Sequence, residues 1–505
     1  MTAAVHRVTA REPLTLLRDA MLASAILAGA LVVARIAAAD RPRVALALAI
    51  GLAVLIAALA APRRALLLLV LWLVVLGFVR RVVSVAVPID DHDPLLLAGA
   101  FGIAVVCVPA LRGNALVPRS ALATTVFVLQ GLILASAFNP LQGGLSVGLM
   151  GLLFLLVPTI GFWIGRGLGD DAMFERLFRL VAAVGVLVAV YGLVQVLHDF
   201  PSWDAIWIRD RGYLALNVGE AMRPFGPFAS SAEYVLFLGV ALVACFAFGF
   251  RGPASIASLV AVPVLTVAVF LASTRGVVFT LAGALTLMAV ARRRAPLLLA
   301  PAAAVAAVLI VPPLTERIAP AVVEGGRTND LITHQVEGLS NPLSSESSTL
   351  LVHLAMIGDG LQSVVDNPLG IGGATVTVAP TTLGGETAST EADPSNLAVA
   401  LGLPGFLAYV ALATIALRRA YHLATERRDA LPLAALGVLV VTFFQWFTGG
   451  HYAVTFIVWL ALGWLDRASL EARPRPRLGA YPSLSPAYAP AAEGDSRSSL
   501  RRDAP

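Results

Sequence analysis

Long apolar runs cover most of the chain and are separated by short stretches that contain arginine, proline or glycine. A helix that crosses a membrane needs about 20 predominantly apolar residues, and many of these runs approach that length. We expect spans near residues 20–38, 44–61, 65–79, 95–111, 120–137, 146–165, 177–198, 232–250, 254–273, 276–291, 296–312, 396–417, 430–447 and 451–466. The pattern therefore predicts an all-α polytopic transmembrane bundle of 12–14 spans.

The spacing of the runs predicts how the chain is organised. The first run is expected to be a transmembrane helix rather than a signal peptide, because Arg35 interrupts it and a second span follows within a few residues. The expected parts are a cytoplasmic N-terminus (1–19), a transmembrane bundle (20–312) with an extracytoplasmic segment (199–231), a large extracytoplasmic loop (313–395), three last spans (396–466) and a disordered, Pro- and Arg-rich cytoplasmic tail (467–505).

Composition agrees with this class. Hydrophobic residues make up 58% of the 505 positions and charged residues 13%, against about 25% charged residues in soluble proteins. A soluble enzyme, a nucleic-acid-binding module and a disordered scaffold are therefore poor interpretations. All 36 basic residues are arginine, and the abundance of Ala, Leu, Val and Gly is typical of a GC-rich bacterial genome. We expect a multi-pass protein of the bacterial cytoplasmic membrane.

Arginine placement predicts the sides, because cytoplasmic loops retain positive charge. With both termini inside, most arginines fall in cytoplasmic segments, and the 313–395 loop carries ten acidic residues against Arg317 and Arg327. The bias is weakest among the first spans, where Arg41, Arg43, Arg80 and Arg81 fall outside. The high isoelectric point thus follows from membrane topology and indicates no nucleic-acid partner.

The 199–231 segment carries the first candidate chemistry. Arg223 stands just before a turn at Gly226 and a buried span, where an arginine is costly unless it meets an anion or a carboxylate, and Glu233 is the expected internal partner. Trp203 and Trp207 share a helix face, which suits either an interfacial aromatic belt or a shelf that stacks a sugar. Arg209 and Arg211 are outer candidates for binding phosphate.

Two later stretches add polar groups at predicted span ends. Arg275 lies in a short break between apolar runs on the outer side, where it is either a chance loop residue or a cation held for phosphate. Residues 351–365 are expected to form an amphipathic helix that stops at Asn367 and Pro368. Asn396 opens the next span, which Gly402 interrupts, and broken helices near a membrane face commonly line a site.

Four short motifs occur in one order across these stretches. They are Arg223-Pro224-Phe225-Gly226-Pro227-Phe228, Thr274-Arg275-Gly276, the turn from Asn367 to Gly372, and Asn396 followed by Gly402-Leu403-Pro404-Gly405. Together they resemble the O-antigen ligase and polysaccharide polymerase family over roughly residues 199–417. That family has a His-Asn pair where this chain has Ser395-Asn396.

The resemblance implies a membrane glycosyltransferase that works on the extracytoplasmic face without a metal ion or another cofactor. Its donor would be a saccharide linked to a polyprenyl diphosphate, and its acceptor a glycan, lipid or other hydroxyl. Arg223 and Arg275 would stabilise the leaving diphosphate, and Gly226, Gly370, Gly372 and Asn396 would support the site. With Ser395 in the histidine position, the base that activates the acceptor must lie elsewhere. The candidates are His353 first, Glu233 second, and then Asp359 and Asp393.

Other interpretations remain open from the sequence. A transporter or flippase of a lipid-linked oligosaccharide would suit the span count equally, and so would a catalytically inactive relative. Asp90-Asp91-His92-Asp93 suits an acidic metal motif or, more simply, a solvated interfacial turn. His198, His334 and His451 lack metal-ligand spacing, and Cys107 and Cys245 lie in apolar runs, so neither a metal site nor a disulfide framework is expected.

Overall fold

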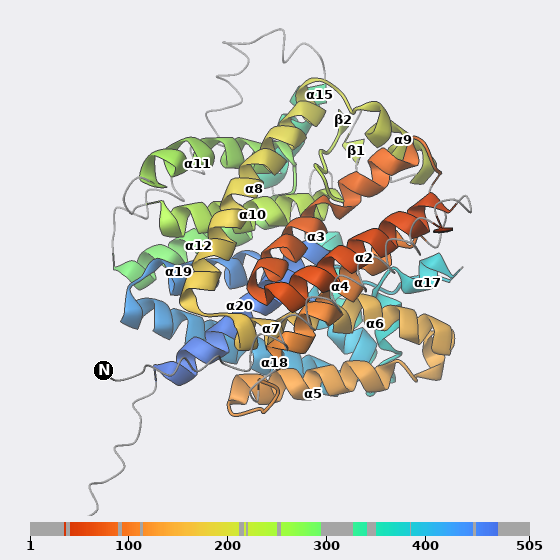
Figure 1. Ribbon diagram of the computed structural model, residues 1–505, viewed down its shortest axis with the longest axis vertical. Coiled ribbons are helices and arrows are strands. Elements are labelled where there is room, and N and C mark those ends of the chain that lie inside the picture. The colour runs from red at the N-terminus through yellow and green to blue at the C-terminus, as the bar shows by residue number, and fades with distance from the viewer. Residues whose placement is uncertain are drawn as a thin grey trace, which may run out of the picture.

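The computed structural model describes residues 35–36, 41–88, 93–111, 115–211, 217–218, 221–249, 254–293, 327–340, 350–383, 385–447 and 451–472. The described part is almost entirely helical, which confirms the all-α class (Figure 1). The predicted spans 296–312 and, apart from residues 35–36, 20–38 lie outside the described residues, as do the N-terminus 1–19 and residues 473–505 of the tail.

The first half of the chain is a series of apolar helices. They are α2 (Pro42–Ala60), α3 (Pro62–Ser84), α4 (Leu95–Ala110), α5 (Ala121–Ser136), α6 (Leu145–Thr159), α7 (Gly161–Leu168) and α8 (Asp171–Leu197), with a short 3₁₀ helix η1 (Pro140–Gln142) before α6. The segment after α8 forms α9 (Ser202–Arg211) and a small antiparallel hairpin of β1 (Asn217–Val218) and β2 (Ala221–Met222).

The second half alternates long apolar helices with shorter elements. They are α10 (Ser231–Phe248), α11 (Ala254–Leu271), α12 (Arg275–Arg292), α15 (Arg327–Ser340), α16 (Leu350–Asp366), η4 (Gly373–Val376), α17 (Ala379–Thr382), α18 (Asp393–Arg427), α19 (Ala430–Val441) and α20 (Tyr452–Glu471). α16 matches the amphipathic helix expected over 351–365, whereas α15 and the hairpin were not foreseen. α15 is short and mostly polar, although Leu331, Ile332, Val336 and Leu339 recur at helical spacing.

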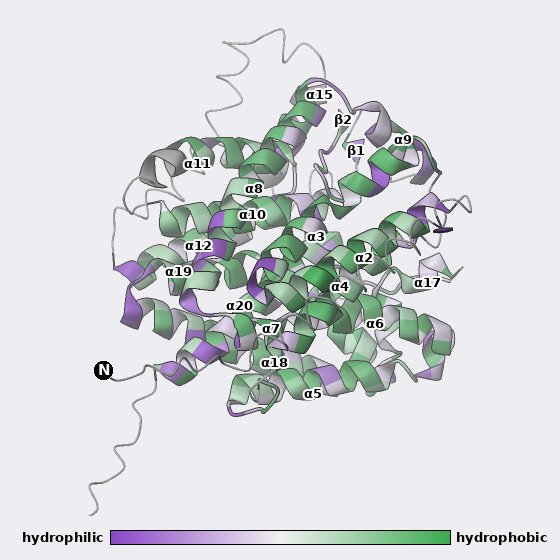
Figure 2. Cartoon of the chain, in the orientation of Figure 1, coloured by the Kyte–Doolittle hydropathy of each residue, from purple (hydrophilic) through white to green (hydrophobic). Residues whose placement is uncertain are grey.

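Within the described residues, eight helices are long and apolar enough to cross a membrane, and four shorter apolar helices accompany them. Each predicted span other than 20–38 and 296–312 coincides with one of these twelve helices. Hydrophobic residues cover the helices, and hydrophilic residues gather at their ends (Figure 2). A polytopic membrane protein is therefore confirmed at this level.

The interior of the bundle is built around α10 and α20. In their apolar windows 89% and 83% of the residues are buried, so these two helices face other helices rather than lipid. α20 lies against α7 at glycines, and a Cβ on Gly463 would lie 2.0 Å from the carbonyl oxygen of Phe162. Small residues permit this close approach of two backbones in a membrane.

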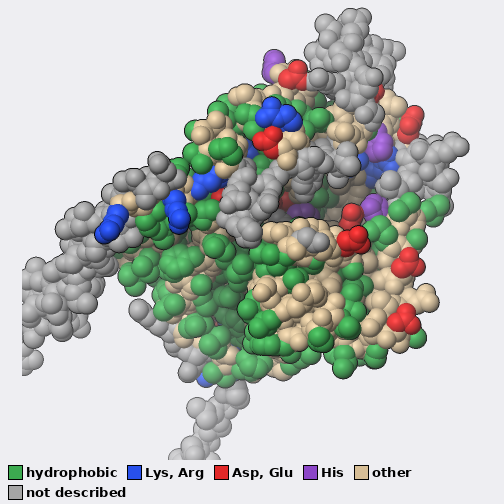
Figure 3. Space-filling model, turned by 90° about the vertical axis from the view of Figure 1, so that its right-hand side faces the viewer, with side chains coloured by type: hydrophobic (Ala, Val, Ile, Leu, Met, Phe, Trp, Pro, Cys, Tyr) green, Lys and Arg blue, Asp and Glu red, His purple; other side chains and the backbone are tan. Residues whose placement is uncertain are grey.

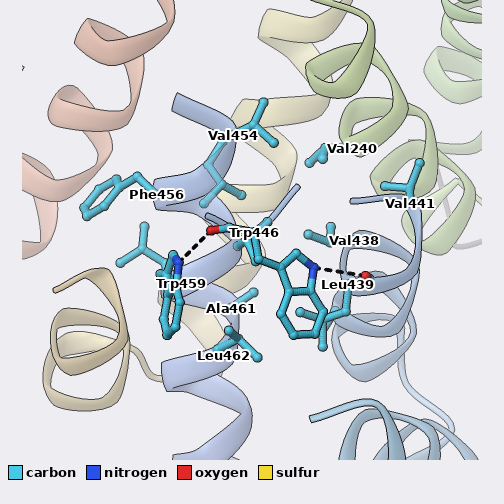
Figure 4. Close-up of a cluster of buried hydrophobic side chains, with 14 of the residues drawn as sticks. Val240, Val438, Leu439, Val441, Trp446, Val454, Phe456, Trp459, Ala461 and Leu462 are labelled. Carbon is cyan, nitrogen blue, oxygen red and sulfur yellow. Dashed lines mark hydrogen bonds between the residues drawn. The ribbon is translucent and has the colours of Figure 1, made fainter. Parts of the chain in front are cut away.

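Aromatic side chains fill the space beside α20. Trp446 and Trp459 are fully buried, and the indole of Trp459 donates to the carbonyl oxygen of Trp446 at 2.9 Å (Figure 4). The indole of Trp446 donates to the carbonyl oxygen of Leu439 at 3.3 Å. Both buried N–H groups are thereby satisfied, which fixes the segment after α19 against α20.

Candidate functional site

A cavity of about 440 Å³ lies where the turn after β2 meets the first turns of α10 and α12, together with α15, α16 and the segment after α19. Apolar side chains such as Leu236, Val277 and Phe279 form much of its wall. Its titratable groups are Arg223, Arg275, His334, His353 and Glu391. Four of these residues come from segments predicted to be extracytoplasmic, and Arg275 from a predicted outer span break.

The cavity brings together the two arginines that the sequence singled out. Arg275 donates from Nη2 to the carbonyl oxygen of His334 at 2.7 Å, and Nη2 of Arg223 lies 3.4 Å from Nε2 of His334. Within the described part of the chain, the buried Nε atoms of both arginines have no hydrogen-bond partner. Burial lowers the pKa of Arg223, and the charge of Arg275 lowers it further. Two adjacent cations with unused donors favour an anionic ligand.

A buried polar network holds the turn that carries Arg223. Arg81 donates from Nη2 to the carbonyl oxygen of Gly226 at 2.6 Å and also donates to the carbonyl oxygen of Phe228. Gln195 accepts from the backbone N–H of Gly226 at 2.8 Å. Gly226 has φ +52, and a Cβ there would lie 2.6 Å from the ring of Tyr234. Gly226 therefore supports the site by permitting this tight turn.

The segment that carries Arg275 is also constrained. Ser273 has φ +52 and is buried, and its hydroxyl donates to the carbonyl oxygen of Leu331 on α15 at 3.3 Å. Arg275 is the first residue of α12. The break between α11 and α12 thus places Arg275 against α15 and makes it a cavity residue rather than a chance loop residue.

His353 and Glu391 lie together on the same cavity. Nδ1 of His353 is 3.4 Å from a carboxylate oxygen of Glu391, and the two side chains are 43% and 65% exposed, so both are accessible. Glu391 has φ +61, a strained conformation for a residue with a side chain, and Gln445 donates to its carbonyl oxygen at 2.7 Å. The loop therefore holds Glu391 beside the imidazole.

Ser395, at the position where the family that the motifs resemble has a histidine, does not line the cavity. It is fully buried, and its hydroxyl is 2.6 Å from that of Thr390. Asn396 accepts from the backbone N–H of Thr390 at 2.7 Å. Both residues hold the loop that carries Glu391, so Asn396 supports the site indirectly, through this loop.

The turn at Asn367–Gly372 fits into the break in α18. Gly402 has φ +65, and the backbone N–H groups of Ile371 and Gly372 donate to the carbonyl oxygens of Val399 and Ala400 at 2.9 and 3.0 Å. Gly370 has φ +76, and a Cβ there would lie 2.4 Å from the carbonyl oxygen of Ala400. Gly370 thus permits the backbone contact that fixes the C-terminal end of α16, and Gly372, with φ +107, lies against the side chain of Gln142.

The other acids expected near the site are placed elsewhere, and the pairing of Glu233 with Arg223 is wrong. Glu233 accepts from the backbone N–H of Ala453 at 3.0 Å, because the unpaired N–H groups and dipole at the start of α20 attract a carboxylate. Asp393 accepts from the backbone N–H of Phe447 at 3.1 Å. Among the described residues neither these two nor the exposed Asp359 lines the cavity.

The outer arginines and tryptophans do not extend the cavity. Arg209 is 75% exposed, pairs with Asp210 at 3.0 Å and lines a separate cavity of about 450 Å³. The side chain of Arg211 lies outside the described residues. Trp207 is buried against Phe225, and Trp203 donates to the hydroxyl of Tyr191, so packing rather than an open stacking shelf explains them.

Asp93, the last residue of the acidic motif before α4, does not lie in the solvated turn that the sequence suggested. Asp93 is 3% exposed and binds Arg43 and Arg80 at 3.0 and 2.7 Å, so it is not a solvated residue. Asp90, Asp91 and His92 lie outside the described residues. Within the part of the chain that is described, no group of three His, Cys, Asp or Glu side chains could hold a metal ion.

Sequence reasoning missed three of the residues that shape this site. Spacing gave no signal for His334 or Glu391, because each reaches the cavity only through tertiary packing. Arg81 had a signal, since two consecutive arginines end an apolar run. Cys107 and Cys245 are free cysteines. A comparison with protein-family models and with curated proteins finds no match.

Figure 3 views the end of the molecule where α9 and α17 lie in Figure 1. Arginine, acidic and histidine side chains gather in the upper part of this view, and hydrophobic side chains form a broad surface below them.

Proposed function

We propose that this protein is a membrane glycosyltransferase of the O-antigen ligase and polymerase type. It transfers a saccharide from a polyprenyl-diphosphate donor to a hydroxyl acceptor on the extracytoplasmic face. The observation that carries the proposal is the meeting of Arg223 and Arg275 on one cavity that also holds the His353–Glu391 pair.

The arginines act on the leaving group. As the bond between the anomeric carbon and the diphosphate oxygen breaks, negative charge grows on the diphosphate, and fixed cations in a partly dry cavity stabilise that charge. A guanidinium can bind phosphate oxygens in a bidentate manner, and both Arg223 and Arg275 line the cavity. Their Nε donors are buried and, among the described residues, have no hydrogen-bond partner.

The His353–Glu391 pair acts on the acceptor. Glu391 holds Nδ1 of His353, which leaves Nε2 to take the proton of the acceptor hydroxyl. The acceptor oxygen then forms the new bond to the anomeric carbon, and the lipid diphosphate departs with the electron pair of the old bond. Apolar residues such as Leu236 and Phe279 give the lipid chain a compatible wall.

The test uses purified protein in lipid nanodiscs with a synthetic polyprenyl-diphosphate saccharide and glycan or lipid acceptors. We expect Arg223→Ala and Arg275→Ala to lose about 10²–10³-fold of the transfer rate, the range for removal of one charge-stabilising donor. Lysine at either position should recover little, because a point charge lacks the bidentate fork.

Arg209→Ala is the matched control, since Arg209 is an exposed arginine on a different cavity. Transfer that survives both cavity substitutions as well as it survives the control would contradict the proposal. Donor movement across a proteoliposome membrane without any product would instead identify a flippase.

A further inference from the structure

His334 lies between the two arginines of the cavity. Its carbonyl oxygen accepts from Arg275 at 2.7 Å, and its Nε2 lies 3.4 Å from Arg223. The main-chain contact anchors this turn of α15 to the start of α12, and the ring lines the cavity itself. An imidazole held between two guanidinium groups is repelled by both whenever it carries a proton.

We propose that His334 is a third diphosphate-binding residue, which takes up a proton and donates a hydrogen bond when the anion enters between Arg223 and Arg275. This inference rests on the proposed function and concerns the same donor. It assigns to α15 a direct part in recognising the substrate.

The surroundings of the imidazole explain why the proton arrives with the ligand. Burial, and then the charges of Arg275 and Arg223, lower the pKa of His334 to about 4, so the ring is neutral at pH 7 in the empty cavity. A diphosphate diester carries two negative charges, which offset the two arginines and supply acceptor oxygens. Both changes favour the protonated ring and raise its pKa in the complex.

The other charged groups near the ring are few. Glu337 on the same helix interacts with Arg275, and His353 and Glu391 lie on the same cavity. On α15 itself, Asp330 stands one turn before His334, and the neighbouring α11, β1 and β2 contain no ionisable residue. α8 packs against α15 through the apolar Leu193 and Val196. Both histidines of the cavity could take up a proton, but only His334 contacts the arginines directly. The experiment must therefore distinguish proton uptake by His334 from proton uptake by His353.

Proton uptake gives the binding a defined pH dependence. The affinity for the diphosphate should be greatest below the pKa that His334 has without the ligand. As the pH rises, the affinity should fall by at most about tenfold per pH unit until the pH passes the higher pKa of His334 in the complex. Above that value the affinity should no longer change with pH through this group.

The experiment is isothermal titration calorimetry on the full chain in nanodiscs. The probe is a farnesyl-diphosphate-glucose diester, whose phosphates do not titrate between pH 5 and 9. Titrations in two buffers of different ionisation enthalpy measure the protons bound. We expect wild type and His422→Gln, the exposed control, to take up protons on binding at pH 6, and His334→Gln to take up markedly fewer.

His353→Gln should keep the proton uptake that depends on His334. His334→Gln should bind about tenfold more weakly than wild type at pH 5.5 and nearly equally at pH 8.5, provided that its elution profile and its melting temperature at pH 8.5 match wild type. His334→Asn is the second variant if His334→Gln is poorly folded.

Equal affinities and equal proton uptake in wild type and His334→Gln would overturn this inference. The assignment of Arg223 and Arg275 to diphosphate binding would still stand if Arg223→Ala abolished binding. A wild-type protein that does not bind the diester, or an Arg223→Ala variant that binds it equally well, would overturn the proposed function as well.

Discussion

Arg81 near the end of α3 donates from Nε to the carboxylate of Asp204 on α9 at 2.7 Å, and both side chains are fully buried. Tyr191 and Gln195 of α8 donate to the second carboxylate oxygen at 2.6 and 2.7 Å. This pair joins three helices to the turn at Gly226, so it positions Arg223 without touching the cavity. It also explains why Arg81 departs from the usual charge asymmetry, because its charge is paired inside the protein.

Removal of one member of this pair should unfold the site region. Arg81→Ala or Asp204→Ala leaves an uncompensated buried charge, which typically costs about 3–5 kcal/mol of stability. Thermal unfolding in detergent measures the loss, with the exposed Arg209→Ala as control. Arg81→Met combined with Asp204→Leu should recover only part of the lost stability, because the carbonyl oxygens of Gly226 and Phe228 still lack their donor. Donor binding should not recover. Full binding by the double variant would show that the network does not position Arg223.

The His353–Glu391 pair predicts a graded effect on catalysis. His353→Ala should lower the transfer rate about 10²–10⁴-fold, the usual worth of general-base assistance, while donor affinity stays within a few-fold. Glu391→Gln should cause a smaller loss, because the amide still accepts a hydrogen bond but stabilises the imidazolium less. His422→Ala is a better control than His334→Ala, since His334 contacts both arginines. Equal, small effects at His353 and His422 would remove His353 from the mechanism.

Glu233 should matter for stability and not for the reaction. Its carboxylate accepts from the backbone N–H of Ala453 in the first turn of α20. Glu233→Ala removes a buried hydrogen bond at a helix start and leaves the backbone N–H of Ala453 without a partner, which should cost about 1–3 kcal/mol. The transfer rate per folded molecule should remain that of wild type. A large fall in rate with an unchanged melting temperature would return Glu233 to the list of catalytic candidates.

The folded state should lose stability in mild acid through His334. Its pKa of about 4 in the folded protein lies below the unfolded value of 6.5, so the unfolded chain binds more protons between these two values. The contribution of His334 is complete above pH 6.5 and is lost as the pH falls toward 4. Melting temperatures between pH 4 and 8 should therefore fall less steeply with acid in His334→Gln than in wild type. Parallel curves would show that His334 is already protonated in the folded state.

Topology can be tested by cysteine labelling in intact cells. In a background of Cys107→Ala and Cys245→Ala, a membrane-impermeant maleimide should modify Glu337→Cys on the exposed face of α15 and not Ser483→Cys in the tail. The expectation rests on the arginine asymmetry of the loops. Labelling of the tail cysteine alone would reverse every assignment of sides.

The helices of this protein could be predicted from the sequence because hydropathy is a local property. A run of apolar residues in a membrane must satisfy its own backbone hydrogen bonds, and a helix does so within one segment. For the same reason α10, α18 and α20 begin close to the expected positions. The sequence also indicated Arg223 and Arg275, because a charged residue at the end of an apolar span is costly unless it binds an anion or a carboxylate.

The partners of these groups were decided only by tertiary packing. Glu233 stands ten residues from Arg223 and was expected to bind it, yet the start of α20 offers unpaired N–H groups to its carboxylate. His334 meets Arg275 across 59 positions, and Arg81 meets Asp204 across 123. Hydropathy and spacing carry no information about which helices pack together. Buried charged side chains bind whichever partner that packing brings within hydrogen-bond distance.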